Sequence, residues 1–176
     1  MTRLARAGVV ALLLAPALLG AQPRRVTVMI RGYGQPVMLD TLASYSDIAE
    51  PPARVFNAAV KVLDELKLTR TDHDAAHGLL ANRMLTARVR LAGHPMSWMI
   101  HGGSDMLGDY ADTWRVSLAW AVYVDSVGPA ASRLGIALLA GANNVEGAYK
   151  PAVACGSTGS LETDIAKRVR LVLASN

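Results

Sequence analysis

Trp-Arg-Val-Ser-Leu-Ala-Trp-Ala-Val-Tyr-Val-Asp, residues 114–125, is the stretch that decides the fold. Large apolar side chains occupy every even position up to Val124, and the odd positions are mostly small or polar. Successive residues of a strand point to opposite faces, so this period of two predicts a long strand with one face in the core. Gly128-Pro129 then predicts a turn, and the small and apolar run 134–142 predicts a strand that pairs back and lies centrally in the sheet.

Helices are predicted on either side of this strand pair. Pro51-Pro52 fits a first helical turn, where backbone amides have no helical partner, and an apolar stripe then continues to Leu66. A second apolar stripe, with charged residues on the other face, spans residues 161–173. Alternation over residues 79–91 predicts another strand, in which Arg83 breaks the pattern and indicates a bulge.

The order of these elements predicts the fold class. Hairpin-length connections favour antiparallel pairing. We therefore predict an α+β fold, with an antiparallel sheet of four to five strands packed on one face by two helices, in a helix-grip-like arrangement. A length of 176 residues fits one domain. We expect residues 1–21 to be a signal peptide, 22–49 an N-terminal strand and loop segment, and 50–176 the α+β domain.

The N-terminal residues have the features of a secretory signal peptide. Arg3 and Arg6 form a basic region, an apolar stretch follows, and Gly20-Ala21 supplies small residues for cleavage near Ala21. The apolar stretch is about half the ~20 residues that a membrane-spanning helix needs, so a retained anchor is the lesser alternative. Gln22 stands where a lipoprotein has its lipidated Cys. We expect an exported protein, periplasmic or secreted, that is not lipid-anchored and has no transmembrane helix in the mature chain.

Composition and charge exclude several classes of protein. Hydrophobic residues make up 52% and charged residues 18%, which fits a packed core and excludes disorder. The 18 Lys and Arg exceed the 14 Asp and Glu by four, and two of the arginines lie in the signal segment. The remaining excess of two is too small to indicate a nucleic-acid partner.

Cys155 is the single cysteine, so no intramolecular disulfide is possible. A buried, inert thiol is the favoured interpretation. An intermolecular disulfide and a reactive thiol are the alternatives, although the sequence shows no group placed to activate a thiolate.

His73 and His77 are spaced i, i+4, which on a helix places two imidazoles on one face. A metal site needs at least three ligands, and the segment 72–78 (Asp-His-Asp-Ala-Ala-His-Gly) has turn chemistry. We therefore predict that residues 72–78 form a solvated turn at the end of a hairpin, with a metal site as the alternative. The run 156–160 likewise predicts a capping turn, with incidental anion binding as its alternative, and no cofactor is implied.

A hydrolase would have to draw on His101, Ser104 and Asp105 in the Gly-rich connection before the long strand. The nucleophile elbow requires Gly two residues on either side of Ser, and Met106 does not meet this requirement. A Ser-His-Asp set assembled in three dimensions is the less favoured alternative, so we expect a protein that is not an enzyme.

The segment Pro-Met-Ser-Trp-Met-Ile, residues 95–100, is an apolar cluster in a region predicted to be a loop. Buried loop packing or a short strand is the favoured interpretation. The other is an exposed apolar patch, which on soluble proteins often marks an interface. We take Trp98, Met99, Ile100 and His101 as the candidate partner-binding residues.

The run Cys-Gly-Ser-Thr-Gly-Ser-Leu-Glu, residues 155–162, resembles the Cys-x-Ser-Thr-Gly-x-Leu-Glu segment of small, uncharacterised exported bacterial domains. In those domains another Cys precedes a Gly-rich loop and a segment like Tyr110-Ala111-Asp112. His101-Gly102-Gly103 takes that place here, so the disulfide that the resemblance implies is absent. Over residues 50–173, the order of helix, antiparallel sheet and helix is similar to the helix-grip domains of BamC-type outer-membrane assembly lipoproteins. This resemblance implies an envelope protein and brings no catalytic residues.

The leading hypothesis is an exported, periplasmic or envelope-associated domain that binds an envelope protein partner. The alternative is a binder of a small apolar or anionic ligand between the helices and the sheet. Small residues in the two long strands could leave space for such a ligand, although they also suit close packing. These residues are Ala119, Ala121, Gly135, Ala137 and Gly141. The sequence leaves the identity of the partner and the oligomeric state open.

Overall fold

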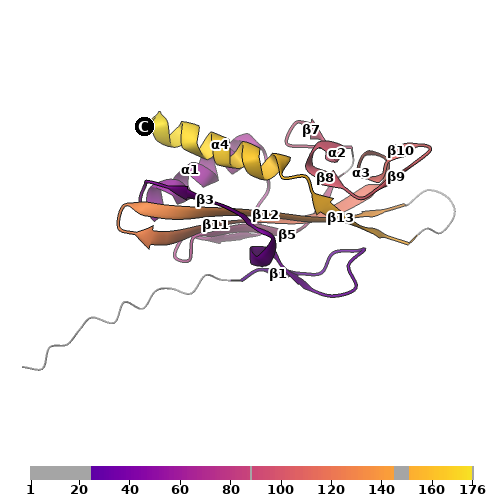
Figure 1. Cartoon of the computed structure of the whole chain (residues 1–176), viewed down its shortest axis with the longest axis horizontal. Helices are drawn as coiled ribbons and strands as arrows, with labels where there is room; N and C mark the ends of the chain where they lie inside the picture. The colour runs from indigo at the N-terminus through magenta and orange to yellow at the C-terminus, as the bar shows by residue number, and fades with distance from the viewer. Residues whose placement is uncertain (1–24, 88, 145–150, 176) are drawn as a thin grey trace, which may run out of the picture.

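A computed structural model of the chain describes residues 25–87, 89–144 and 151–175. Its centre is a pair of long antiparallel strands, β11 (Arg115–Gly128) and β12 (Ala131–Asn143), seen edge-on in Figure 1. The predicted strand pair is therefore confirmed. β12 pairs with β11 along one edge and with two shorter strands along the other, so its predicted central position is confirmed as well.

The main antiparallel sheet has seven strands in the described part of the chain, and the expected four to five were too few. Its order is β4-β5-β11-β12-β13-β8, and β3 also pairs with β12. The additional strands are pieces of two to five residues, which carry too little alternation to be recognised from sequence. The shorter members are β3 (Ser44–Ile48), β4 (Asp72–Asp74), β5 (Leu79–Ala87), β8 (Ile100–His101) and β13 (Val153–Ser157).

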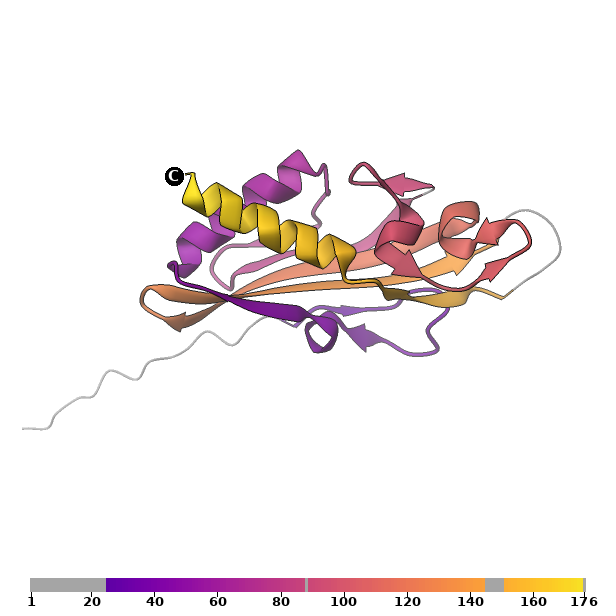
Figure 2. The same cartoon turned by 45° about the horizontal axis from the view of Figure 1, so that its top comes forward.

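Four α-helices lie within the described residues, two more than expected. The long helices α1 (Pro52–Glu65) and α4 (Ser160–Ala174) lie against each other on one face of the sheet (Figure 2). The other two, α2 (Met96–Met99) and α3 (Tyr110–Thr113), are single turns in the connection between β5 and β11. The α+β class with an antiparallel sheet is confirmed, whereas the counts of strands and helices were wrong.

The larger core lies between the helices and the even-numbered face of β11. Trp114 and Trp120 are buried there, as their positions in the alternation predict. Phe56 of α1 is a buried anchor of the same core. Glu162 was expected to face water with the other charged residues of α4, but only 5% of it is exposed. Its carboxylate accepts a hydrogen bond from the Ser157 hydroxyl at 2.5 Å, which holds the side chain beneath the start of α4.

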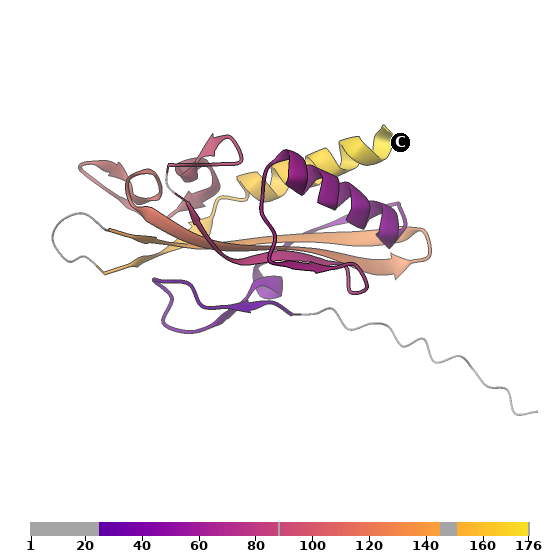
Figure 3. The ribbon, with the colours of Figure 1, turned by 180° about the vertical axis from the view of Figure 1, so that it is seen from behind.

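A second core lies on the opposite face of the sheet, which the prediction of one covered face did not include. The N-terminal segment covers this face (Figure 3) with β1 (Thr27–Val28), β2 (Val37–Met38) and the 3₁₀ helix η1 (Leu39–Leu42). The buried apolar residues that it contributes are Val26, Val28, Ile30 and Leu39.

The five small residues considered as possible lining for a ligand lie on the face of the sheet that the N-terminal part of the chain covers. Ala119, Ala121 and Ala137 pack in the second core, and Gly141 lies beneath the backbone of Arg31. The Gly135 backbone lies under the Tyr45 ring. The small side chains therefore allow the N-terminal segment to approach the sheet closely, and they do not open a space between the helices and the sheet.

The connection between β5 and β11 forms an insertion, defined here as residues 89–114, at the end of the molecule where β11 begins (Figure 2). It carries two small hairpins in addition to α2, α3 and β8. Their strands are β6 (Arg90–Leu91), β7 (His94–Pro95), β9 (Ser104–Asp105) and β10 (Gly108–Asp109). None of the helices within the described residues combines the length and apolarity needed to cross a bilayer.

Candidate functional site

Two of the four predicted partner-binding residues are not at the surface. Met99 is 0% and Ile100 1% exposed, so the expected apolar patch is not formed by these side chains. The physical reason is that the segment is a helical turn followed by a strand. Met96 and Met99, three residues apart, lie on the same side of α2 and enter the core, while Ile100 is fixed in β8 opposite Ser157.

The other two predicted residues do reach the surface. Trp98 is half-buried, and its indole stacks on the His94 imidazole at a centroid distance of 4.0 Å. The Trp98 carbonyl accepts a hydrogen bond from the Thr158 hydroxyl at 2.6 Å, which ties α2 to the turn before α4. His101 is exposed on β8. Trp98 and His101 thus remain candidates for contact with a partner.

The most exposed apolar side chains of the insertion are at a place that the sequence analysis missed. Met106 and Leu107 form the tip of the β9–β10 hairpin, and relative to an extended chain they are 103% and 83% exposed. Neither side chain is covered by the described residues. Met106 and Leu107 are called the hairpin tip below.

The hairpin tip is a well-defined turn. An oxygen of the Asp105 carboxylate accepts the backbone N–H of Leu107 at 2.9 Å. Gly108 has a φ of +115°, which side-chain-bearing residues rarely adopt. Asp in the first and Gly in the fourth position are typical of a tight β-turn, whose two central residues point outward. The sequence signal was therefore the turn pattern Asp-Met-Leu-Gly with apolar residues in its centre.

Two interactions hold the base of the insertion. The Asp112 carboxylate of α3 accepts the backbone N–H of Ser97 in α2 at 2.9 Å. The rings of Tyr110 and Trp114 stack at a centroid distance of 4.1 Å. The hairpin thus projects from a base in which α2 and α3 are joined and Trp114 is anchored in the core.

Three of the residues weighed for catalysis or metal binding, Asp105, Asp74 and His77, take part in local turn interactions. Asp105, a member of the possible hydrolase set with His101 and Ser104, helps to form the turn at the hairpin tip. The Asp74 carboxylate contacts Nδ1 of His77 at 2.9 Å and accepts its backbone N–H, as is typical of a turn. Across residues 25–87, 89–144 and 151–175, no group of three or more His, Cys, Asp or Glu side chains is placed to hold a metal ion.

Cys155 is buried, as favoured from the sequence. Burial raises the pKa of its thiol, which lowers the thiolate fraction at neutral pH. On the side of the second core, the Tyr33 hydroxyl donates to the Cys155 carbonyl at 3.0 Å. Gly102 lies against the thiol, since a Cβ added there would be 3.3 Å from the Cys155 Cβ. The segment His101-Gly102-Gly103, which takes the place of the second Cys in the similar exported domains, is therefore adjacent to Cys155 in space.

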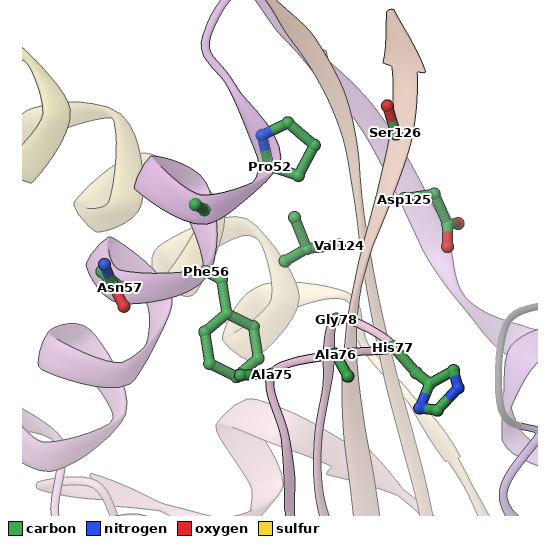
Figure 4. A pocket seen from close by; sticks show the side chains of 11 residues that line it. Pro52, Phe56, Asn57, Ala75, Ala76, His77, Gly78, Val124, Asp125 and Ser126 are labelled. Carbon is green, nitrogen blue, oxygen red and sulfur yellow. The ribbon is translucent and has the colours of Figure 1, made fainter. Parts of the chain in front are cut away.

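A pocket of about 530 Å³ lies between the start of α1, the β4–β5 turn and the end of β11 (Figure 4). This volume is in the range of small-molecule sites, roughly 300–1,000 Å³. The pocket is at the edge of the sheet on the helix-covered side. Its lining residues are Pro52, Ala53, Phe56, Asn57, Ala75, Ala76, His77, Gly78, Val124, Asp125 and Ser126.

Comparisons with protein-family models and with curated proteins found no match to this chain. The assignment of function therefore depends on the chemistry of its own surface.

Proposed function

We propose that this chain is an exported, periplasmic or envelope-associated, non-enzymatic domain that binds a protein partner through the hairpin tip of its insertion. The observation that carries the proposal is the exposure of Met106 and Leu107, at 103% and 83%, on a turn fixed by Asp105. Export is proposed from the signal-like residues 1–21, which lie outside the described part of the chain.

The hairpin tip has the properties of a binding anchor. Covering an exposed Met or Leu side chain contributes about 1.5–3 kcal/mol, so the pair could supply several kcal/mol of association free energy. A turn that is already ordered loses less conformational entropy on binding than a flexible loop. In the free protein neither side chain is buried, so the apolar character of these two residues adds little to the stability of the fold.

Charge in the insertion favours a protein partner over a lipid surface. The insertion, residues 89–114, contains three Asp, at positions 105, 109 and 112, against a single Lys or Arg residue, Arg90, at its start. An anionic membrane attracts basic segments and repels acidic ones. The surface that fits the tip is an apolar pocket on a protein, with basic or neutral groups around its rim to meet the carboxylates.

Replacement of Met106 and Leu107 by Ser tests this proposal. Tagged wild-type and M106S/L107S proteins are cross-linked in their own envelope fraction, and the retained proteins are quantified by mass spectrometry. We expect a stoichiometric partner whose recovery falls by about tenfold or more in the variant, which is the effect of losing ~1.4 kcal/mol. The variant should keep the melting temperature of the wild type.

V127S is the matched control, because Val127 is another exposed apolar residue, 49% exposed, near the opposite hairpin turn between β11 and β12. Recovery of the partner should be unchanged by V127S. Equal recovery with M106S/L107S and with wild type, or an equal loss with V127S, contradicts the proposed role of the hairpin tip.

A further inference from the structure

The end of β11 has a sheet edge without a neighbouring strand among the described residues. The Val124 N–H donates to the Gly78 carbonyl at 2.8 Å, and there β5 gives way to the β4–β5 turn while β11 continues to Gly128. Backbone groups of alternate strand residues point to the same edge. The N–H and C=O of Ser126 therefore face the edge that β5 leaves, and Ser126 is exposed.

The pocket beside this edge has an apolar floor. In Figure 4, the Phe56 ring and the Val124 side chain face each other across it, while the His77 ring and the Asp125 carboxylate turn away. Phe56 is held by an edge-to-face contact with the His73 ring, with centroids 5.4 Å apart. An apolar group is favoured between these side chains, and a charged group would lose its hydration there.

One ligand could contact both the open strand edge at Ser126 and the apolar floor of the pocket. Even-numbered residues of β11 point to the helix-covered face, so Ser126 shares a face with Val124. A strand added at the open edge would place its residue opposite Ser126 on this same face. The backbone of that residue would exchange two hydrogen bonds with Ser126, and its side chain would enter the pocket.

We propose that this edge and pocket bind a short extended peptide segment of another protein, with one large apolar or aromatic side chain seated between Phe56 and Val124. The unpaired backbone groups favour a peptide over an apolar small molecule, because only the peptide satisfies them. The site is independent of the hairpin tip, which lies at the other end of β11 (Figure 2). Failure of either proposal would leave the other intact.

The probe is a panel of capped, fluorescently labelled heptapeptides, Thr-Val-Thr-X-Thr-Val-Thr, titrated with the purified protein and followed by fluorescence anisotropy. We expect peptides with X as Phe, Leu or Trp to bind about tenfold more tightly than those with Ser, Asp or Lys. A copy of the Phe peptide that is N-methylated at X should lose about tenfold in affinity, because its central donor is removed. Equal affinity across the panel, or no binding up to about 1 mM, overturns the proposal.

Two substitutions at Ser126 test the strand edge in the protein. S126P removes the backbone N–H that faces the edge, and S126A keeps this N–H while removing the hydroxyl that donates to the Gly128 carbonyl. We expect the Phe peptide to bind S126A as it binds wild type and S126P about tenfold more weakly. Should S126P unfold, the N-methylated peptide still decides the question. Equal binding by S126P and S126A overturns the pairing.

Discussion

Gly141→Ala is the sharpest test of the second core. An added Cβ at position 141 would lie 2.9 Å from the Arg31 carbonyl carbon and 3.1 Å from Cγ2 of Ile30, and the Arg31 oxygen is closer still. The Arg31 oxygen sets the limit, because it would lie far inside an ordinary contact distance, so the Arg31 backbone must retreat by about 1 Å or more. This obstacle is backbone, and it cannot rotate away as a flexible side chain can.

The cost follows from what the N-terminal segment buries. Val28 and Ile30 are buried on the sheet, and each contributes roughly 1.5–3 kcal/mol by its burial. A gap of about 1 Å removes about half of the contact energy. We therefore expect G141A to lower the free energy of unfolding by about 1.5–3 kcal/mol, within the usual range for overpacking.

Urea unfolding of three alanine variants measures this effect. At Gly135 the added Cβ would meet Cδ1 of Tyr45 at 2.8 Å, but this ring is 47% exposed and can move outward, so we expect a loss of about 1 kcal/mol or less. At Gly156 no atom lies within 4 Å, and G156A is the neutral control. G141A should also accelerate tryptic cleavage after Arg31. If G141A is as stable and as protected as G156A, the packing of the segment on β12 is refuted.

Three further results are expected. Cys155 should resist iodoacetamide in the native protein and react on unfolding in urea, because its thiol is buried; rapid native labelling would contradict this. Gly102→Cys should form a disulfide with Cys155, since the two Cβ atoms would be 3.3 Å apart, just short of the usual range of about 3.5–4.5 Å, and a small shift of the two segments brings them into it. Oxidation should then raise the free energy of unfolding over that of the reduced variant, by up to about 4 kcal/mol for a loop of ~50 residues, and no change on oxidation would exclude the bond. Burial raises the pKa of Asp125, and the nearby charge of Arg133 offsets only part of this effect. The folded state of the wild type therefore loses stability as pH rises through this raised pKa and the buried carboxyl becomes charged. The melting temperature of D125N relative to wild type should increase between about pH 3 and pH 7, and a constant difference would argue against a desolvated carboxylate.

The parts of the fold that were predictable have strong local signals. The alternation over residues 114–125 specified β11, and the helical stripes specified α1 and α4, because each pattern is set by the geometry of its own element. The bulge expected at Arg83 was also predictable, because this residue interrupts the alternation of its strand. The pairing of β5 with β11 shifts register between Leu118 and Trp120, opposite the segment that contains Arg83.

The second core was missed because it depends on contacts between distant parts of the chain. Residues 25–43 have only two-residue strands and one 3₁₀ helix, so their local pattern is weak. A signal was nevertheless present on the sheet. Ala119, Ala121, Ala137 and Gly141 make one face of the long strands small, and a backbone can approach such a face closely. Neither the weak pattern of residues 25–43 nor the small side chains of the sheet identifies the N-terminal segment as what covers this face, since small residues also suit helix packing.

The two apolar clusters of the insertion show why a candidate surface cannot be chosen by composition. Met99 and Met106 are the same residue type in the same connection, yet the first is buried and the second is fully exposed. The difference lies in the local backbone: α2 turns Met99 toward the core, whereas the turn fixed by Asp105 and Gly108 directs Met106 outward. Turn chemistry is readable in sequence, and the docking of a single helical turn is not. An apolar pair at the centre of a β-turn is therefore stronger evidence of a binding surface than a longer apolar run whose secondary structure is unknown.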